Sequence, residues 1–205
     1  MAKNRLYKVL SRIVELKPGE ELIALLFFFY FFLITAPFWI IKPLRDAIYL
    51  HSLSYRNLPI AYLLTAIVMG FVVAFHSKLQ AKVQRNLLLT FTLGGFLFTC
   101  LVFWWLFPRD WGWISLVFWI WANMMVIVLV TQFWITVNTV FNPREAKRMI
   151  GFFGSGGILG GIAGAETAGL LAKSRISNHL LLIACALLLV CVFVVRAIFH
   201  LHKRR

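Results

Sequence analysis

Two basic residues and one acidic residue directly follow a long apolar run near the start of the chain. Lys42, Arg45 and Asp46 lie within five positions, after a run without charge from 22 to 41. Lys42 and Asp46 are four residues apart, a spacing that lets them pair on one helix face. An arginine offers a planar fork and a lysine a point charge, and both suit phosphate. The cluster is therefore either a structural ion pair at the membrane interface or a site that binds an anion.

Three further polar side chains stand inside apolar stretches, where an unpaired polar group is costly. Gln132 and Asn138 are interpreted either as substrate contacts or as polar glue between helices. Glu166 is either a substrate or proton-coupling group, or a residue near the outer interface. No paired carboxylates, nucleophile–base set or metal-ligand cluster shares a face, so we predict neither enzyme activity nor a cofactor.

A glycine-rich stretch supplies small residues at four-residue spacing. Gly157 and Gly161 form one such pair, and Gly160 and Gly164 form another. Neither the phosphate-loop pattern nor the dinucleotide fingerprint occurs there. Small residues four apart let two helix backbones approach closely, so this stretch is predicted to pack against a neighbouring helix.

The composition indicates an all-α integral membrane protein. Hydrophobic residues make up 61% of the 205 positions and charged residues 14%, against roughly 45–50% and about 25% in soluble domains. Several apolar runs reach the roughly 20 residues that cross a bilayer as a helix. They occupy most of the chain and leave no room for a soluble catalytic domain. Six spans are predicted, at about 22–41, 58–75, 87–107, 114–140, 149–171 and 179–201.

The net charge of +14 is distributed along the chain in a way that predicts orientation. Basic residues gather in cytoplasmic loops, so the charge indicates membrane topology rather than a nucleic-acid partner. The chain divides into an amphipathic cytoplasmic segment on the lipid surface (1–21), a six-helix bundle (22–201) and a basic cytoplasmic tail (202–205). Lys42 and Arg45 then lie toward the outer side, against the rule, and this favours a separate role for them.

This topology predicts that positions 109 and 205 lie on opposite sides of the membrane. A single cysteine replacing Arg109 should react with an impermeant thiol reagent from outside. A cysteine replacing Arg205 should react only after the membrane is opened. Labelling of both from the same side would contradict the arrangement.

Two segments carry a resemblance to a known family. The first is the aromatic run that leads into Lys42-Pro43-Leu44-Arg45-Asp46. The second is Phe141-Asn142-Pro143-Arg144-Glu145-Ala146-Lys147-Arg148, a capped helix start, followed by Gly151-Phe152-Phe153-Gly154-Ser155-Gly156-Gly157. In order and spacing they resemble the non-mitochondrial ATP/ADP translocases, and most closely the uncharacterised bacterial relatives of these nucleotide transporters.

The resemblance implies a major-facilitator-type fold, in which two six-helix halves enclose a substrate at the midplane. This chain corresponds to the N-terminal half, and a bacterial inner membrane is implied. Implied partners are membrane lipid and a second half, a second copy of the chain or a larger membrane complex.

Two functions are predicted as alternatives. The first is a transporter half that moves a nucleotide or another phosphorylated or organic anion by alternating access. Lys42 and Arg45 would bind phosphate there, and Gln132 or Asn138 would add polar contacts. The second is a non-transporting subunit that docks into a larger membrane complex.

Overall fold

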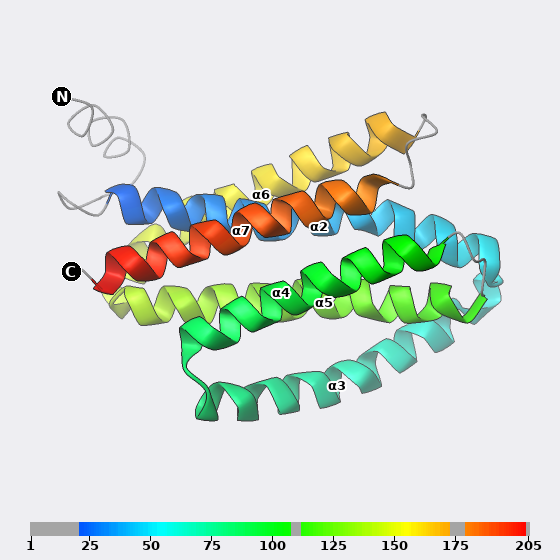
Figure 1. Ribbon diagram of the computed structural model, residues 1–205, viewed down its shortest axis with the longest axis horizontal. Helices are drawn as coiled ribbons and strands as arrows, with labels where there is room; N and C mark the ends of the chain where they lie inside the picture. Colours follow the sequence, from blue (N-terminus) through cyan, green and yellow to red (C-terminus); the bar gives the residue numbers. More distant parts are fainter. Residues whose placement is uncertain (1–20, 108–111, 173–178, 204–205) are drawn as a thin grey trace.

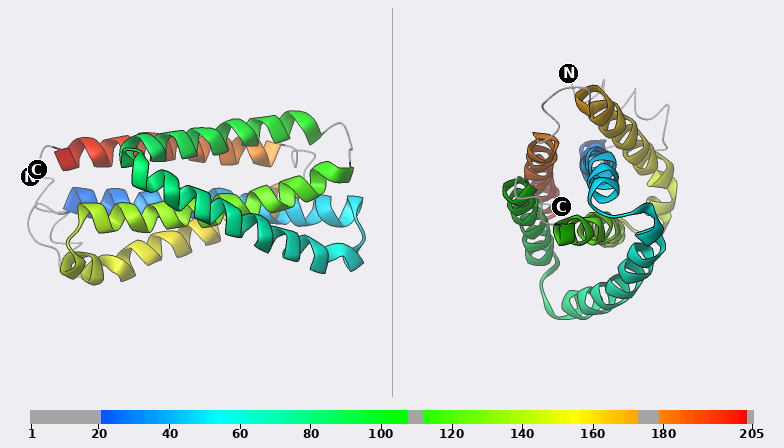
Figure 2. Two further views of the ribbon diagram at one scale, coloured as in Figure 1. Left: turned by 90° about the horizontal axis from the view of Figure 1, so that it is seen from below. Right: turned by 90° about the vertical axis from the view of Figure 1, so that its right-hand side faces the viewer.

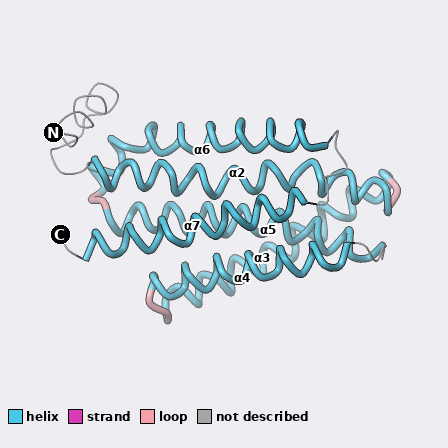
Figure 3. The backbone as a smooth tube through the Cα atoms, turned by 45° about the horizontal axis from the view of Figure 1, so that its top comes forward, coloured by secondary structure: helices cyan, strands magenta, loops and turns pink. Residues whose placement is uncertain are grey.

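The computed structural model describes residues 21–107, 112–172 and 179–203, and nearly all of them are helical. Six long helices follow one another: α2 (Glu21–Ser52), α3 (Leu58–Lys82), α4 (Arg85–Leu106), α5 (Gly112–Val140), α6 (Pro143–Ala172) and α7 (Leu180–Lys203). A short 3-10 helix, η1 (Tyr55–Asn57), precedes α3. Figure 3 shows the connections at the two ends of the bundle. The six predicted spans are confirmed as helices, whereas residues 1–20 of the predicted surface segment and residues 204–205 of the basic tail lie outside the described residues.

Five of these helices are long and apolar enough to cross a membrane: α2, the η1–α3 unit, α4, α5 and α7. The chain is therefore a multi-pass, all-α membrane protein. Helix α6 is equally long, but its glycines and the charges of its first two turns make it less apolar. Its start follows the predicted cap, because the Asn142 backbone N–H donates to Glu145 Oε2 (3.2 Å).

Helix α2 continues well beyond the predicted end of the first span. It runs without a break through Pro37 and Pro43 to Ser52. Its 32 residues extend over about 48 Å, whereas the hydrocarbon core is about 30 Å thick. The apolar run from 22 to 41 fills that core, so Lys42 and Arg45 lie about one turn beyond it. The last turns of α2 lie at one end of the bundle, and the start of α2 and the end of α7 lie at the other (Figure 1).

The packing of the helices follows an inverted repeat. Helix α2 packs on α6 and α7, and α5 packs on α3 and α4, while α2 contacts α5 and α4 contacts α7. Exchanging α2 with α5, α3 with α6 and α4 with α7 maps these pairs onto one another. A unit of three helices reverses direction when it is repeated, so the second three-helix unit is inverted relative to the first.

This arrangement leaves one side of the α2–α5 pair open. In the end view of Figure 2, α6 lies beyond α2 and α3 beyond α5, while α4 and α7 cover one flank. Among the described residues, no helix covers the other flank. Helix α3 is the least enclosed, since only Ala61, Thr65 and Met69 of its residues are buried.

The glycines of α6 allow it to lie directly against α2, which confirms the predicted close packing. A Cβ atom on Gly164 would lie 2.5 Å from the Ala36 carbonyl oxygen, and one on Gly160 would lie 2.6 Å from that of Phe32. Gly157 and Gly161 face the rings of Phe31 and Trp39 in the same way. A hydroxyl bridges the two backbones, because Thr35 Oγ1 donates to the Gly157 carbonyl oxygen (3.0 Å).

Candidate functional site

The buried arginine of α2 is held by three neighbours. Arg45 is 4% exposed. It donates to Asp46 Oδ1 from Nη2 (2.7 Å) and Nε (2.9 Å), and to Asn123 Oδ1 of α5 from Nη1 (2.9 Å). Its guanidinium carbon lies 4.1 Å from the centroid of the Trp119 ring. These contacts offset the cost of burying a cation, and they tie α2 to α5.

An aromatic cluster surrounds this ion pair at the same end of the bundle. Trp119 contacts Tyr49 of α2 (ring centroids 4.8 Å apart) and Tyr62 of α3 (5.5 Å). Asn123 is oriented by its own hydrogen bond, from Nδ2 to the Trp119 carbonyl oxygen (2.9 Å). Sequence reasoning missed the roles of Trp119 and Asn123. Their four-residue spacing places them on one face of α5, but nothing local to them points to Arg45.

The pairing of Lys42 with Asp46 that the four-residue spacing allows is not the one in the structure. Asp46 accepts from Arg45 instead, because the arginine fork reaches back to the adjacent carboxylate. Lys42 Nζ lies over the Trp39 ring, 4.5 Å from its centroid. Within the part of the chain that the structure describes, no carboxylate pairs with Lys42. Lys42 is therefore a half-buried cation with a cation–π contact and no neutralising partner among the described residues.

Trp39 also borders an open apolar groove between α2 and α6, with a volume of about 550 Å³. Phe31 lines the same groove and stacks on Phe133 of α5 (4.3 Å), so the groove lies on the side of α2 that faces α5. Ile158 and Ile162 of α6 form the other wall. Lys42 thus places a positive charge beside an aromatic and aliphatic surface.

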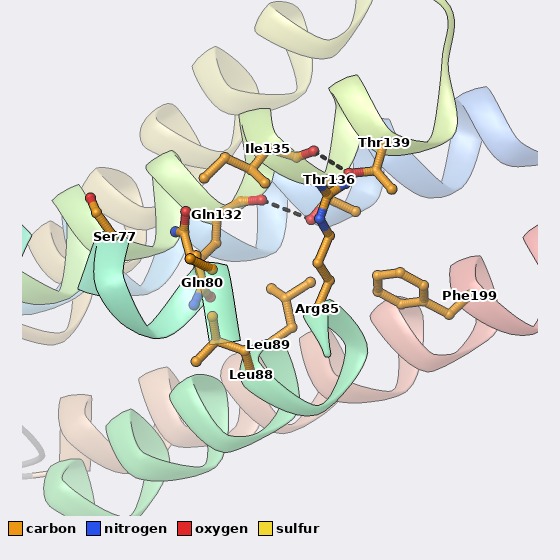
Figure 4. A pocket seen from close by; sticks show the side chains of 11 residues that line it. Ser77, Gln80, Arg85, Leu88, Leu89, Gln132, Ile135, Thr136, Thr139 and Phe199 are labelled. Carbon is orange, nitrogen blue, oxygen red and sulfur yellow. Dashed lines mark hydrogen bonds between the residues drawn. The ribbon is translucent and has the colours of Figure 1, made fainter. Parts of the chain in front are cut away.

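The other predicted site residues lie elsewhere. Gln132 is buried near the opposite end of α5, where it lines a cavity between α3, α4, α5 and α7 (Figure 4). Asn138 and Glu166 are exposed on α5 and α6. Trp119, which contacts Arg45, is about 20 residues from Thr139 of the cavity, or about 30 Å along the helix. Gln132 therefore belongs to a different site from Lys42 and Arg45.

The fold and these sites define a multi-pass helical membrane protein with a buried ion pair and a cation beside an apolar groove. No family model, curated protein or solved structure matches the chain.

Proposed function

We propose that this chain is one six-helix half of a membrane transporter for a nucleotide or another phosphorylated or organic anion. The observation that carries the proposal is Lys42, which no carboxylate of the described residues neutralises, beside the groove of α2 and α6. A phosphate would bind the ammonium group, and an aromatic or apolar part of the same molecule would lie along Phe31, Ile158 and Ile162.

Arg45 has a positioning role in this proposal. Asp46 is the one acidic residue a single turn from Lys42, and it would neutralise Lys42 if the two paired. Arg45 binds the Asp46 carboxylate through two hydrogen bonds, so Lys42 remains available to an anion. Replacement of Arg45 by lysine would lose the fork and weaken this arrangement.

The inverted packing of the helices supports the transporter half. Major-facilitator-type proteins combine such three-helix repeats into a six-helix half, and two halves rock around a substrate. The flank between α3 and α6 is where a second half or a second copy would sit. Both termini are proposed to be cytoplasmic, in a bacterial inner membrane.

The alternative is a non-transporting membrane subunit. One observation favours it: Arg45, the better phosphate ligand of the pair, is already engaged by Asp46, Asn123 and Trp119. In this alternative the ion pair is structural, and the open flank docks onto a larger complex.

ATP binding by the purified protein in nanodiscs distinguishes the two functions. Lys42→Gln should weaken ATP binding about tenfold or more, because it removes the unneutralised charge. Lys42→Arg should keep most of the affinity, since the charge remains. Lys78→Gln, an exposed residue at the far end of α3, serves as the control and should bind like wild type.

Uptake of labelled ATP into proteoliposomes, alone and with any co-purifying chain, then tests transport. Absence of ATP binding by a monodisperse sample, or equal affinity in Lys42→Gln and wild type, would favour the non-transporting subunit.

A further inference from the structure

A cavity of about 280 Å³ lies between α3, α4, α5 and α7 (Figure 4). It is at the end of the bundle opposite Lys42. Its wall combines a cation, amides and a hydroxyl with apolar side chains: Arg85, Gln80, Gln132, Thr139, Leu88 and Phe199. The ammonium of Lys42 and this cavity are too far apart to share one small molecule. An occupant here is therefore distinct from the anion proposed for the groove.

Arg85 supplies an anion-binding group at the mouth of this cavity. Its Nη1 donates to Thr139 Oγ1, whose own hydrogen goes to the Ile135 carbonyl oxygen (2.7 Å). No carboxylate in the described chain pairs with Arg85, so the remaining guanidinium donors are available. Helix α4 also begins at Arg85, and its N-cap Gln84 makes no side-chain capping bond. Free backbone N–H groups at a helix start favour a phosphate at the same place.

Gln132 lines the same cavity and carries a buried acceptor without a partner. It is 3% exposed. Thr92 gives its hydroxyl hydrogen to the Leu88 carbonyl oxygen (2.8 Å), so Thr92 Oγ1 must accept from Gln132 Nε2 (2.9 Å). The same amide nitrogen lies 3.1 Å from His76 Nε2. This network sets the orientation of the amide and leaves Oε1 buried without a hydrogen-bond partner. An occupant that reaches this oxygen would pair with it through an O–H or N–H group.

We propose that this cavity binds an organic phosphate that also carries a hydroxyl or amino group. The phosphate lies against Arg85 and the start of α4, and the hydroxyl or amino group donates to Gln132 Oε1. A soluble phosphate ester and a phospholipid headgroup share this chemistry. Glycerol phosphate occurs in both forms, so it serves as the probe for both sources.

Binding is measured on the purified full chain in phosphatidylcholine nanodiscs, whose headgroup lacks an O–H or N–H donor. Isothermal titration with glycerol 3-phosphate tests the soluble source. Native mass spectrometry after exchange into phosphatidylglycerol tests the lipid source. Arg85→Gln should weaken binding of the active probe at least about tenfold, and Gln132→Leu should weaken it several-fold. Lys82→Gln is the matched control, because this exposed residue at the end of α3 does not line the cavity.

Binding of glycerol 3-phosphate alone assigns the site to a soluble ester, and retention of phosphatidylglycerol alone assigns it to a headgroup. Either result supports the proposal when Lys82→Gln stays within about twofold of wild type. Absence of binding by both probes would overturn it. Equal effects of Arg85→Gln and Lys82→Gln would overturn it too, as would equal retention of phosphatidylcholine and phosphatidylglycerol without binding of glycerol 3-phosphate.

Discussion

Gly160→Leu should prevent α6 from packing on α2. A Cβ atom at this position would clash with Thr35 Oγ1 and would lie 2.6 Å from the Phe32 carbonyl oxygen. The second contact is with helix backbone, which cannot rotate away as a flexible side chain can. Overpacking of a well-packed core typically costs about 1–3 kcal/mol, and a leucine against backbone should exceed the upper value. The measurement is the yield of monodisperse protein after detergent extraction, with the melting temperature of what remains.

Gly169→Leu provides a control on the same helix. A Cβ atom at Gly169 would meet no atom within 4 Å, so leucine there should leave yield and melting temperature close to wild type. Because both variants add the same side chain to α6, a difference between them isolates the contact with α2. Equal behaviour of Gly160→Leu and wild type would show that α6 does not lie against α2.

Arg45→Gln should lower the free energy of unfolding by about 3 kcal/mol. The substitution leaves the Asp46 carboxylate without its cation and removes the contact over the Trp119 ring. It also removes the donor to Asn123 Oδ1, which connects α2 to α5. Removing one partner of a buried charge pair costs about 3–5 kcal/mol. We expect the lower end of that range, because the Asp46 side chain is 40% exposed. Thermal unfolding in detergent, calibrated against denaturant unfolding, measures the difference.

Arg56→Gln is the matched control for this substitution. Arg56 lies in η1 at the same end of the bundle and is exposed. The same change of charge should therefore have little effect there. A double-mutant cycle with Asn123→Leu adds a second measurement, since directly bonded partners should show a coupling energy of about 1 kcal/mol or more. Additive effects of the two changes would contradict the hydrogen bond between Arg45 and Asn123.

The helices could be predicted from the sequence because each apolar run is long enough to cross a bilayer. Backbone groups in hydrocarbon must bond within their own segment, so such a run has few conformations other than a helix. The prediction bounded the first membrane span at Ile41, and it could not place the end of the helix itself. Charge after Ile41 marks the edge of the apolar run, whereas α2 continues through Pro43 to Ser52. The end of an apolar run marks the edge of the hydrocarbon core, and a helix can extend beyond that edge.

The glycine contact was also predictable, since four-residue spacing of small residues implies close packing whatever the partner helix is. The partner itself was not. That Gly160 and Gly164 meet α2 rather than another helix follows from the inverted packing of the two three-helix units.

The sequence by itself determined the membrane class, the six helices and the residues able to carry charge into the bundle. Only the tertiary structure decided how those residues are grouped. Asp46 pairs with Arg45 rather than with Lys42, because the Arg45 guanidinium packs on the Trp119 ring of α5 at one end of the bundle. Gln132 joins Arg85 at the other end, because α3 and α4 pack on α5 there. Helical spacing reports which residues share a face of one helix. Contacts between helices depend on the rotation and neighbours of each, which arise only when the whole bundle packs.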